Sequence, residues 1–162
     1  MDINTIAKMP NQPIEFNKTY TMTLKNISFG DFPPEILNEM FKNGSLFSHF
    51  GERIIANEFD LKHIIGCKDH DLVDQTDSTI KYDEKTFTKG GCKFMPSSMI
   101  GTGRKFDKAI FDEKSKNMIY VIVSNINFPE IKIRFVKGPE LAALYPTGEI
   151  KFSQYDKFFN QA

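Results

Sequence analysis

Two aspartates and a lysine in the middle of the chain have the types and spacing needed to cut a phosphodiester bond. Asp71 opens an apolar segment, and Asp83 and Lys85 lie two positions apart in the next one. Hydrolysis of a phosphodiester at neutral pH needs an activated water and positive charge at the transition state, and Mg²⁺ held by one or two carboxylates supplies both. We therefore expect Asp71 and Asp83 to bind the metal. Lys85 would orient the attacking water or stabilise the developing negative charge.

An acid followed two residues later by a lysine is a common pattern, so its context must decide. The pattern occurs five times in this chain, starting at Asp60, Asp83, Asp112, Glu130 and Glu149. Asp112 falls in a predicted helix and Asp60 at a helix end, whereas Asp83 follows a short predicted strand that begins with an acid. Context therefore selects Asp83. A solvated hairpin in which Asp83 and Lys85 merely form an ion pair is the alternative for this local pattern.

A β-hairpin is predicted to hold these residues. Residues 72–73 and 79–88 have extended character, and the polar residues 75–78 form a turn between them. Because side chains alternate along a strand, Asp83 and Lys85 should share one face and Glu84 should point away.

Helices and strands around the hairpin predict an α/β sandwich with a mixed sheet. Residues 118–123 are apolar on both faces and should form its central strand, and residues 131–135 alternate as a half-buried strand. A third strand is predicted over residues 92–95. Extended structure, a strand or a hairpin, is predicted within residues 14–29. Helices are predicted over residues 33–41, 45–59, 104–116, 139–145 and 152–159.

Specific residues should set the helix ends and faces. Asn43-Gly44 should end the first helix, and Ser45 should cap the second. In the helix over residues 104–116, the side chains expected to face inward are Phe106, Ile110 and Phe111.

Composition indicates one globular domain over residues 1–162, with an irregular N-terminal arm over residues 1–12. The chain has 40% hydrophobic and 26% charged residues and contains no apolar run long enough to cross a membrane. The first residues lack a secretory signal pattern, so we expect a cytoplasmic protein with no membrane partner. Cys67 and Cys92 are too few for a disulfide framework and are expected to be free thiols.

The distribution of charge is more informative than its sum, which is zero. Acidic residues cluster between Asp69 and Glu84, and no acid lies between Lys85 and Lys105. A neutral chain argues mildly against a nucleic-acid partner, but a basic segment beside the acidic pair suits a phosphate backbone.

Three segments of the sequence resemble small type II restriction endonucleases of the PD-(D/E)XK nuclease superfamily. These segments are residues 70–74, 81–89 and 94–106, with weaker similarity over residues 127–129. The family places an Asp at the start of one strand, an acid-x-Lys or acid-x-Arg next, and then a loop of the form Pro-Ser-Ser-Met-hydrophobic-Gly-x-Gly-Arg. The loop is the most specific part, and residues 96–104 match it.

The resemblance implies a Mg²⁺-dependent, sequence-specific endonuclease with a restriction-endonuclease-like fold and double-stranded DNA as substrate. Asp71 and Asp83 would be metal ligands, although relatives often have Glu at the second position, and Lys85 the catalytic lysine. Glu52 matches a helical Glu that such enzymes often place near the metal. The residues expected to contact DNA are Lys89, Ser97, Ser98, Arg104 and Lys105. A tight loop whose serines cap the next helix is the alternative for residues 96–105.

Other functions remain open from the sequence. A repair or junction nuclease of the same superfamily would use the same carboxylates, and a non-catalytic DNA-binding module would bind without cleaving. The residues that could form a zinc site are His63, Cys67, His70 and Cys92, but they fit no common zinc signature. No Gly-x-Ser-x-Gly motif supports a serine hydrolase. A double-strand cut at a palindrome further predicts a homodimer.

Overall fold

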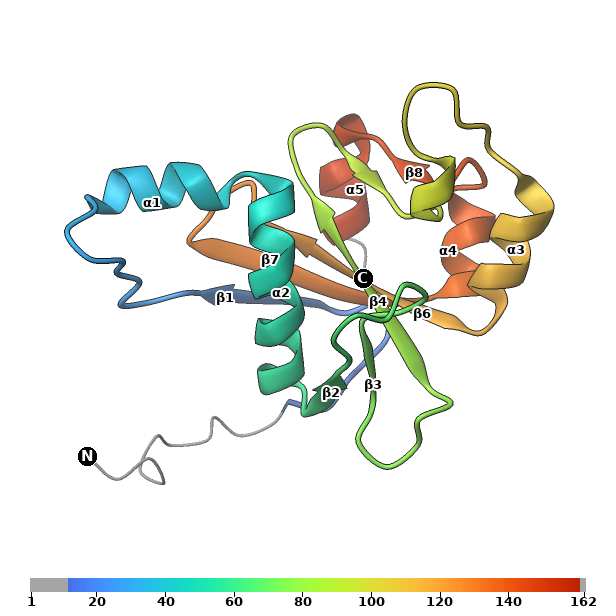
Figure 1. Cartoon of the computed structure of the whole chain (residues 1–162), viewed down its shortest axis with the longest axis horizontal. Helices are drawn as coiled ribbons and strands as arrows, with labels where there is room; N and C mark the ends of the chain where they lie inside the picture. Colours follow the sequence, from blue (N-terminus) through green and yellow to red (C-terminus); the bar gives the residue numbers. More distant parts are fainter. Residues whose placement is uncertain (1–11, 161–162) are drawn as a thin grey trace.

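A six-stranded mixed β-sheet organises the chain in the computed structural model, which describes residues 12–160 (Figure 1). The arm predicted for residues 1–12 lies outside this range except for Gln12. The strand order is β1-β7-β6-β4-β3-β2. The strands span Thr19–Thr23 (β1), Leu61–His63 (β2), Leu72–Asp74 (β3), Lys81–Phe87 (β4), Met118–Ser124 (β6) and Glu130–Lys137 (β7). The mixed α/β class predicted from the sequence is confirmed.

Strands β6 and β4 form the middle of this sheet and determine where the candidate residues lie. β6 is apolar on both faces and almost fully buried, which confirms its predicted central position. It runs parallel to β4, with Asp83 opposite Tyr120, and all other neighbouring strands in the sheet are antiparallel. A parallel pair needs a crossover connection. The segment from β4 to β6 provides it and includes α3, Lys108–Lys116.

Helices cover both faces of the sheet, and each face has its own apolar core. Helix α2, Gly44–Glu58, packs Phe47 and Ile55 on one face against Val121, Val123 and neighbouring side chains. Helices α3, α4 (Gly138–Leu144) and α5 (Tyr155–Phe159) cover the other face. The buried apolar residues of that second core include Phe87, Phe94, Phe111, Tyr120, Ile122, Leu141 and Phe159.

The boundary between α1, Pro34–Phe41, and α2 differs in detail from the prediction. Asn43 is the N-cap of α2, since its side chain accepts a hydrogen bond from the Leu46 backbone N–H at 3.0 Å. The predicted cap Ser45 is therefore wrong, because it lies inside the first turn. An Asn cap of this kind contributes about 1 kcal/mol to helix stability. Helix α1 ends one residue earlier, with Lys42 as its C-cap.

Helix α3 begins later than predicted, which moves a basic pair out of the helix. Its N-cap is Asp107, whose carboxylate accepts a hydrogen bond from the Ile110 backbone N–H at 3.1 Å. Residues 104–107 are therefore irregular, and the predicted helix start at Arg104 is wrong. The inward-facing prediction is also wrong for Phe106 and Ile110, which are exposed, and confirmed for Phe111, which is buried.

Several shorter elements complete the fold. β1 is a single edge strand and no hairpin forms around it. β2 was not predicted, and β5 (Cys92–Lys93) is shorter than predicted and pairs with β8 (Glu149–Ile150) outside the main sheet. The predicted C-terminal helix consists of a 3₁₀ turn, Phe152–Gln154, followed by α5. Within residues 12–160, no helix is both long and apolar enough to cross a membrane.

Gly138 should be essential for the position of α4, because a side chain does not fit there. A Cβ atom at Gly138 would overlap the Ser115 carbonyl oxygen and approach that of Met118 to 2.7 Å. We expect Gly138→Ala to lower the free energy of unfolding by about 1–3 kcal/mol or more. The control Gly90→Ala meets only Thr88 Oγ1 at 3.5 Å and should be near neutral. Urea unfolding compares the variants, and equal losses in both would contradict this account.

Candidate active site

The β3–β4 hairpin brings Asp71 directly beside the strand that carries Asp83 and Lys85. Asp71 immediately precedes β3, and its backbone N–H donates to the Tyr82 carbonyl oxygen at 3.0 Å. Its Oδ2 accepts a hydrogen bond from the Glu84 backbone N–H at 2.8 Å. These two contacts fix the backbone and side chain of Asp71 against β4. The predicted hairpin is confirmed.

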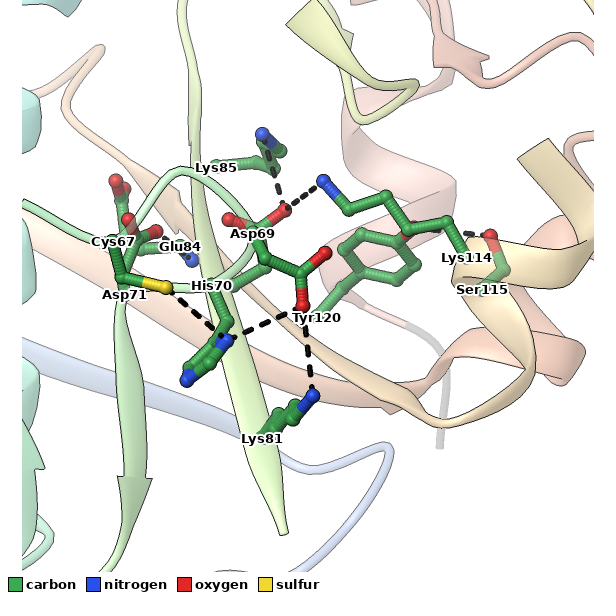
Figure 2. A network of polar contacts seen from close by, with 11 residues as sticks. Cys67, Asp69, His70, Asp71, Lys81, Glu84, Lys85, Lys114, Ser115 and Tyr120 are labelled. Atoms are coloured by element: carbon green, nitrogen blue, oxygen red, sulfur yellow. Dashed lines mark hydrogen bonds and ion pairs between the residues drawn. The ribbon is translucent and has the colours of Figure 1, made fainter. Parts of the chain in front are cut away.

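Asp83 and Lys85 share one face of β4, as strand alternation predicts. Lys85 Nζ lies 3.2 Å from Asp83 Oδ2 (Figure 2). The Glu84 side chain lies on the α2 face, where Gly51 leaves room for it and Thr86 donates a hydrogen bond to its Oε1 at 2.9 Å. Burial raises the pKa of Glu84 well above its usual range.

The Asp71 carboxyl is close enough to that of Asp83 for the two groups to influence each other's protonation. Burial raises the pKa of Asp71 to about 7, with further contributions from the Asp83 charge, a hydrogen bond to the Asp83 carboxyl and the Glu52 charge. The Glu84 N–H opposes this shift. Near neutral pH, without a cation, the pair therefore holds a proton for part of the time. Two converging carboxylates of this kind are suited to a divalent cation.

Lys85 remains a cation in this buried position. Burial alone would lower its pKa, but the charges of Asp83 and Asp71 and a hydrogen bond to Asp83 raise the pKa of Lys85 above its usual value. Its ammonium group is therefore positive at physiological pH. It is available to hold an anionic oxygen.

A second ammonium group, which the sequence interpretation missed, approaches the same oxygen. Lys114 Nζ of α3 lies 3.9 Å from Asp83 Oδ2, and Figure 2 shows Lys114 and Lys85 approaching the same carboxylate oxygen. The next residue, Ser115, shares a hydrogen bond of 3.0 Å with the Tyr120 hydroxyl of β6. That contact fixes this turn of α3 against the sheet. Lys114 belongs to the acid-x-Lys pattern at Asp112, which was set aside because it lies in a helix.

A Mg²⁺ site at Asp71 and Asp83 remains a prediction, in which water or substrate oxygens would be the other ligands. Asp83 Oδ2 is buried and contacts the ammonium groups of Lys85 at 3.2 Å and Lys114 at 3.9 Å, so a bound cation would share this carboxylate with them. Within residues 12–160, no three His, Cys, Asp or Glu side chains are grouped closely enough to hold a metal by themselves. Mg²⁺ is usually held by one or two carboxylates together with water and phosphate. Asp71 and Asp83 meet that lower requirement.

Glu52 lies near the pair but is engaged elsewhere. Its charge contributes to the raised pKa of Asp71. Its Oε2 is 2.8 Å from His63 Nε2, and both side chains are largely buried. Its predicted place beside the metal therefore remains a prediction. His63 is the partner through which Glu52 is held.

The residues predicted to contact DNA are divided among different places. Ser97 and Ser98 line a cleft of about 810 Å³ that also includes Lys114. Arg104 Nη1 donates to the Ser97 carbonyl oxygen at 2.7 Å, so in this structure it braces the loop. Lys105 and Lys89 are exposed, and Lys89 lines a separate hollow near the N-terminus of α2.

The four candidate zinc ligands are not brought together. His63 ends β2 and Cys67 follows in a loop, so their helical spacing is not realised. Cys67 Sγ is 3.6 Å from His70 Nδ1, whereas Cys92 is buried in the core on the other face of the sheet from α2. Both thiols are free.

Comparisons with known proteins add no identification. No protein-family model matches the sequence, and neither curated proteins nor solved structures give a significant match. The case for a function depends on the geometry of this chain.

The raised pKa of Asp71 predicts how stability changes with pH in the absence of divalent cations. A carboxyl with a higher pKa in the folded protein stabilises it at low pH, and this contribution is lost as pH rises through about 7. We expect the free energy of unfolding to fall between pH 5 and 8 in EDTA, and Asp71→Asn to remove much of that fall. Urea unfolding at several pH values measures it.

The control for this prediction is Asp112→Asn. Asp112 is an exposed carboxylate on α3 that pairs with Lys108 at 2.8 Å. Its replacement should leave the slope between pH 5 and 8 unchanged. A wild-type slope that persists in Asp71→Asn would show that Asp71 does not titrate in this range.

Proposed function

We propose that this protein is a Mg²⁺-dependent DNA endonuclease, a type II restriction enzyme of the PD-(D/E)XK superfamily. The observation that supports it best is the convergence of two carboxyl groups from neighbouring segments beside one buried ammonium group. Asp71 is fixed to β4 by the Glu84 N–H, and Lys85 Nζ lies 3.2 Å from Asp83 Oδ2. A solvated surface hairpin would not bury these charges.

Each residue has a defined part in this proposal. Asp71 and Asp83 would hold Mg²⁺, which when bound would polarise the phosphate and acidify a water molecule. Lys85 would hold the attacking water or a non-bridging phosphate oxygen, and its raised pKa keeps it charged for that task. Glu84 and the residues of α2 exclude water from the far side of β4. Glu52, whose charge helps to raise the pKa of Asp71, would be the helical Glu near the metal.

Double-stranded DNA is the proposed substrate. The basic segment from Lys85 to Lys105 follows the site in sequence, and its loop residues Ser97 and Ser98 line the cleft beside it. The similarity of residues 96–104 to a restriction-enzyme loop favours cleavage at a defined sequence. Repair and junction nucleases of the superfamily would use the same carboxylates and differ in DNA substrate.

Cleavage of plasmid and phage DNA in Mg²⁺ should therefore require Lys85. We expect Lys85→Ala to reduce the cleavage rate by roughly 100-fold or more, equivalent to about 3 kcal/mol of transition-state stabilisation, because one preorganised charge is lost. Gel analysis of the digests, with EDTA as the metal-free reaction, measures it. Lys151→Ala is the matched control, since Lys151 belongs to another acid-x-Lys pattern and is exposed.

The cleavage products distinguish a restriction enzyme from the alternative functions. Discrete fragments support a restriction enzyme, whereas a smear, or cutting restricted to damaged or branched DNA, supports a repair or junction nuclease. DNA binding that is independent of the cation, with no cleavage by the wild-type protein, would refute the nuclease and leave a binding module.

A homodimer is part of the proposal, because one site cuts one strand and a twofold pair matches a palindrome. Helix α1 extends from one end of the molecule, and it exposes Ile36 (45%) and Met40 (44%) one turn apart (Figure 1). Phe29 and Phe32 directly before it are 67% and 53% exposed. Such an apolar surface is suited to the same surface on a second copy.

Replacing these side chains by charge should separate the protomers. We expect Ile36→Glu with Met40→Glu to halve the mass measured by light scattering, since two charges would be buried in each copy's interface. Leu144→Glu on α4 is the control, because Leu144 is 56% exposed and α4 lies at the other end of the molecule. A wild-type protein that is monomeric both free and on cognate duplex would rule out the dimer.

A further inference from the structure

A cleft of about 810 Å³ lies directly beside the acidic pair and has no role in holding the metal. It is bordered by the loop around Lys68 and Asp69, the start of β4, the Pro96–Met99 turn and one face of α3. Lys114 belongs both to this cleft and to the active site, because its Nζ is 3.9 Å from Asp83 Oδ2. A ligand in the cleft would therefore be continuous with the reacting centre.

The polar groups of the cleft are mostly hydrogen-bond donors. Three lysines line it, Lys68, Lys81 and Lys114, against the acids Asp69 and Glu113. Asp69 already has partners inside the protein, namely Lys81 Nζ at 3.6 Å and His70 Nδ1 at 3.4 Å. The lining also contains the hydroxyl groups of the loop serines and the amide of Asn117. Such a set of donors is suited to phosphate and sugar oxygens.

Lys114 is the residue that connects the cleft to the chemistry. Its side chain is only 19% exposed, and the ion-pair contact it makes within residues 12–160, with Asp83 at 3.9 Å, is longer than the 3.2 Å contact of Lys85. Two ammonium groups thus share one carboxylate oxygen, and the more distant one is left incompletely neutralised. An anionic oxygen in the cleft would complete its coordination. Ile110 and Met118 provide an apolar wall on which a sugar ring can pack.

We propose that this cleft binds the sugar–phosphate backbone of the strand being cut, with Lys114 on the phosphate next to the reacting one. The proposal is based on the nuclease function proposed above and assigns it a binding path. Lys85 and Lys114 then have separate tasks, since Lys85 acts at the reacting phosphate and Lys114 determines the position of its neighbour. The three lysines of the cleft and its volume of about 810 Å³ favour a chain of nucleotides over a single small anion.

Fluorescence anisotropy with a labelled DNA duplex tests this in a Lys85→Ala background, which allows Mg²⁺ without cleavage. We expect Lys114→Gln to weaken binding and to reduce the slope of log affinity against log salt by about 0.9, the value for one lost phosphate contact. The double variant Lys68→Gln with Lys81→Gln should reduce it further. Lys116→Gln is the matched control, because it lies on the same helix but lines a different hollow.

The possible results distinguish a failure of the proposed cleft function from a failure of the proposed nuclease function. If the lysine variants keep the wild-type affinity and salt dependence while the wild type still cleaves DNA, the cleft does not bind the backbone. The nuclease proposal is then unaffected. If the lysine variants show the expected loss of salt dependence but the wild type cleaves no DNA, the cleft binds DNA and the nuclease proposal is wrong. If the duplex does not bind, and inorganic phosphate or a single nucleotide binds at millimolar concentration in a manner that Lys114→Gln abolishes, the cleft takes a small anion and this inference is wrong.

Discussion

The close approach of the Asp71 and Asp83 carboxyl groups is the constraint that the surrounding structure has to satisfy. Two like charges 4 Å apart repel by about 4 kcal/mol at an effective dielectric of 20, and burial adds to this cost. The fold offsets it with several groups: the Glu84 N–H, a proton on Asp71 near neutral pH, and the ammonium groups of Lys85 and Lys114. The proposed Mg²⁺ ion would offset this repulsion further.

The parallel pairing of β4 with β6 explains how groups far apart in sequence reach this point. A parallel partner needs a crossover, and α3 within that crossover packs on the face of the sheet that carries Asp83. The Tyr120 hydroxyl of β6, opposite Asp83 in register, contacts Ser115 and so fixes the turn that carries Lys114. The second ammonium is therefore positioned by strand pairing, although 31 residues separate it from Asp83 in the numbering.

The sequence patterns predicted the features of the fold that depend on residues close together in the sequence. Alternation placed Asp83 and Lys85 on one face, and continuous apolarity placed β6 at the centre, because both follow from strand geometry. The predicted start of α3 at Arg104 was wrong, because the Asp107 side chain caps the helix three residues later. Lys114 was missed for a different reason. Its distance to Asp83 depends on the crossover and on tertiary packing, which no spacing within one element reveals.

The zero net charge of the chain does not exclude an anionic substrate, because some of its acids lie away from the cleft. Asp74 and Asp77, two of the acids that precede Lys85, lie in the β3–β4 turn, where their carboxylates accept hydrogen bonds from the Thr76 and Thr79 backbone N–H groups at 2.9 Å and 3.0 Å. They stabilise that turn and do not line the cleft. The field at a site depends on the charges nearest to it, since exposed charges more than about 10 Å away are screened at 0.1 M salt. The lysines that line the cleft therefore matter more for a phosphate there than the sum over the chain.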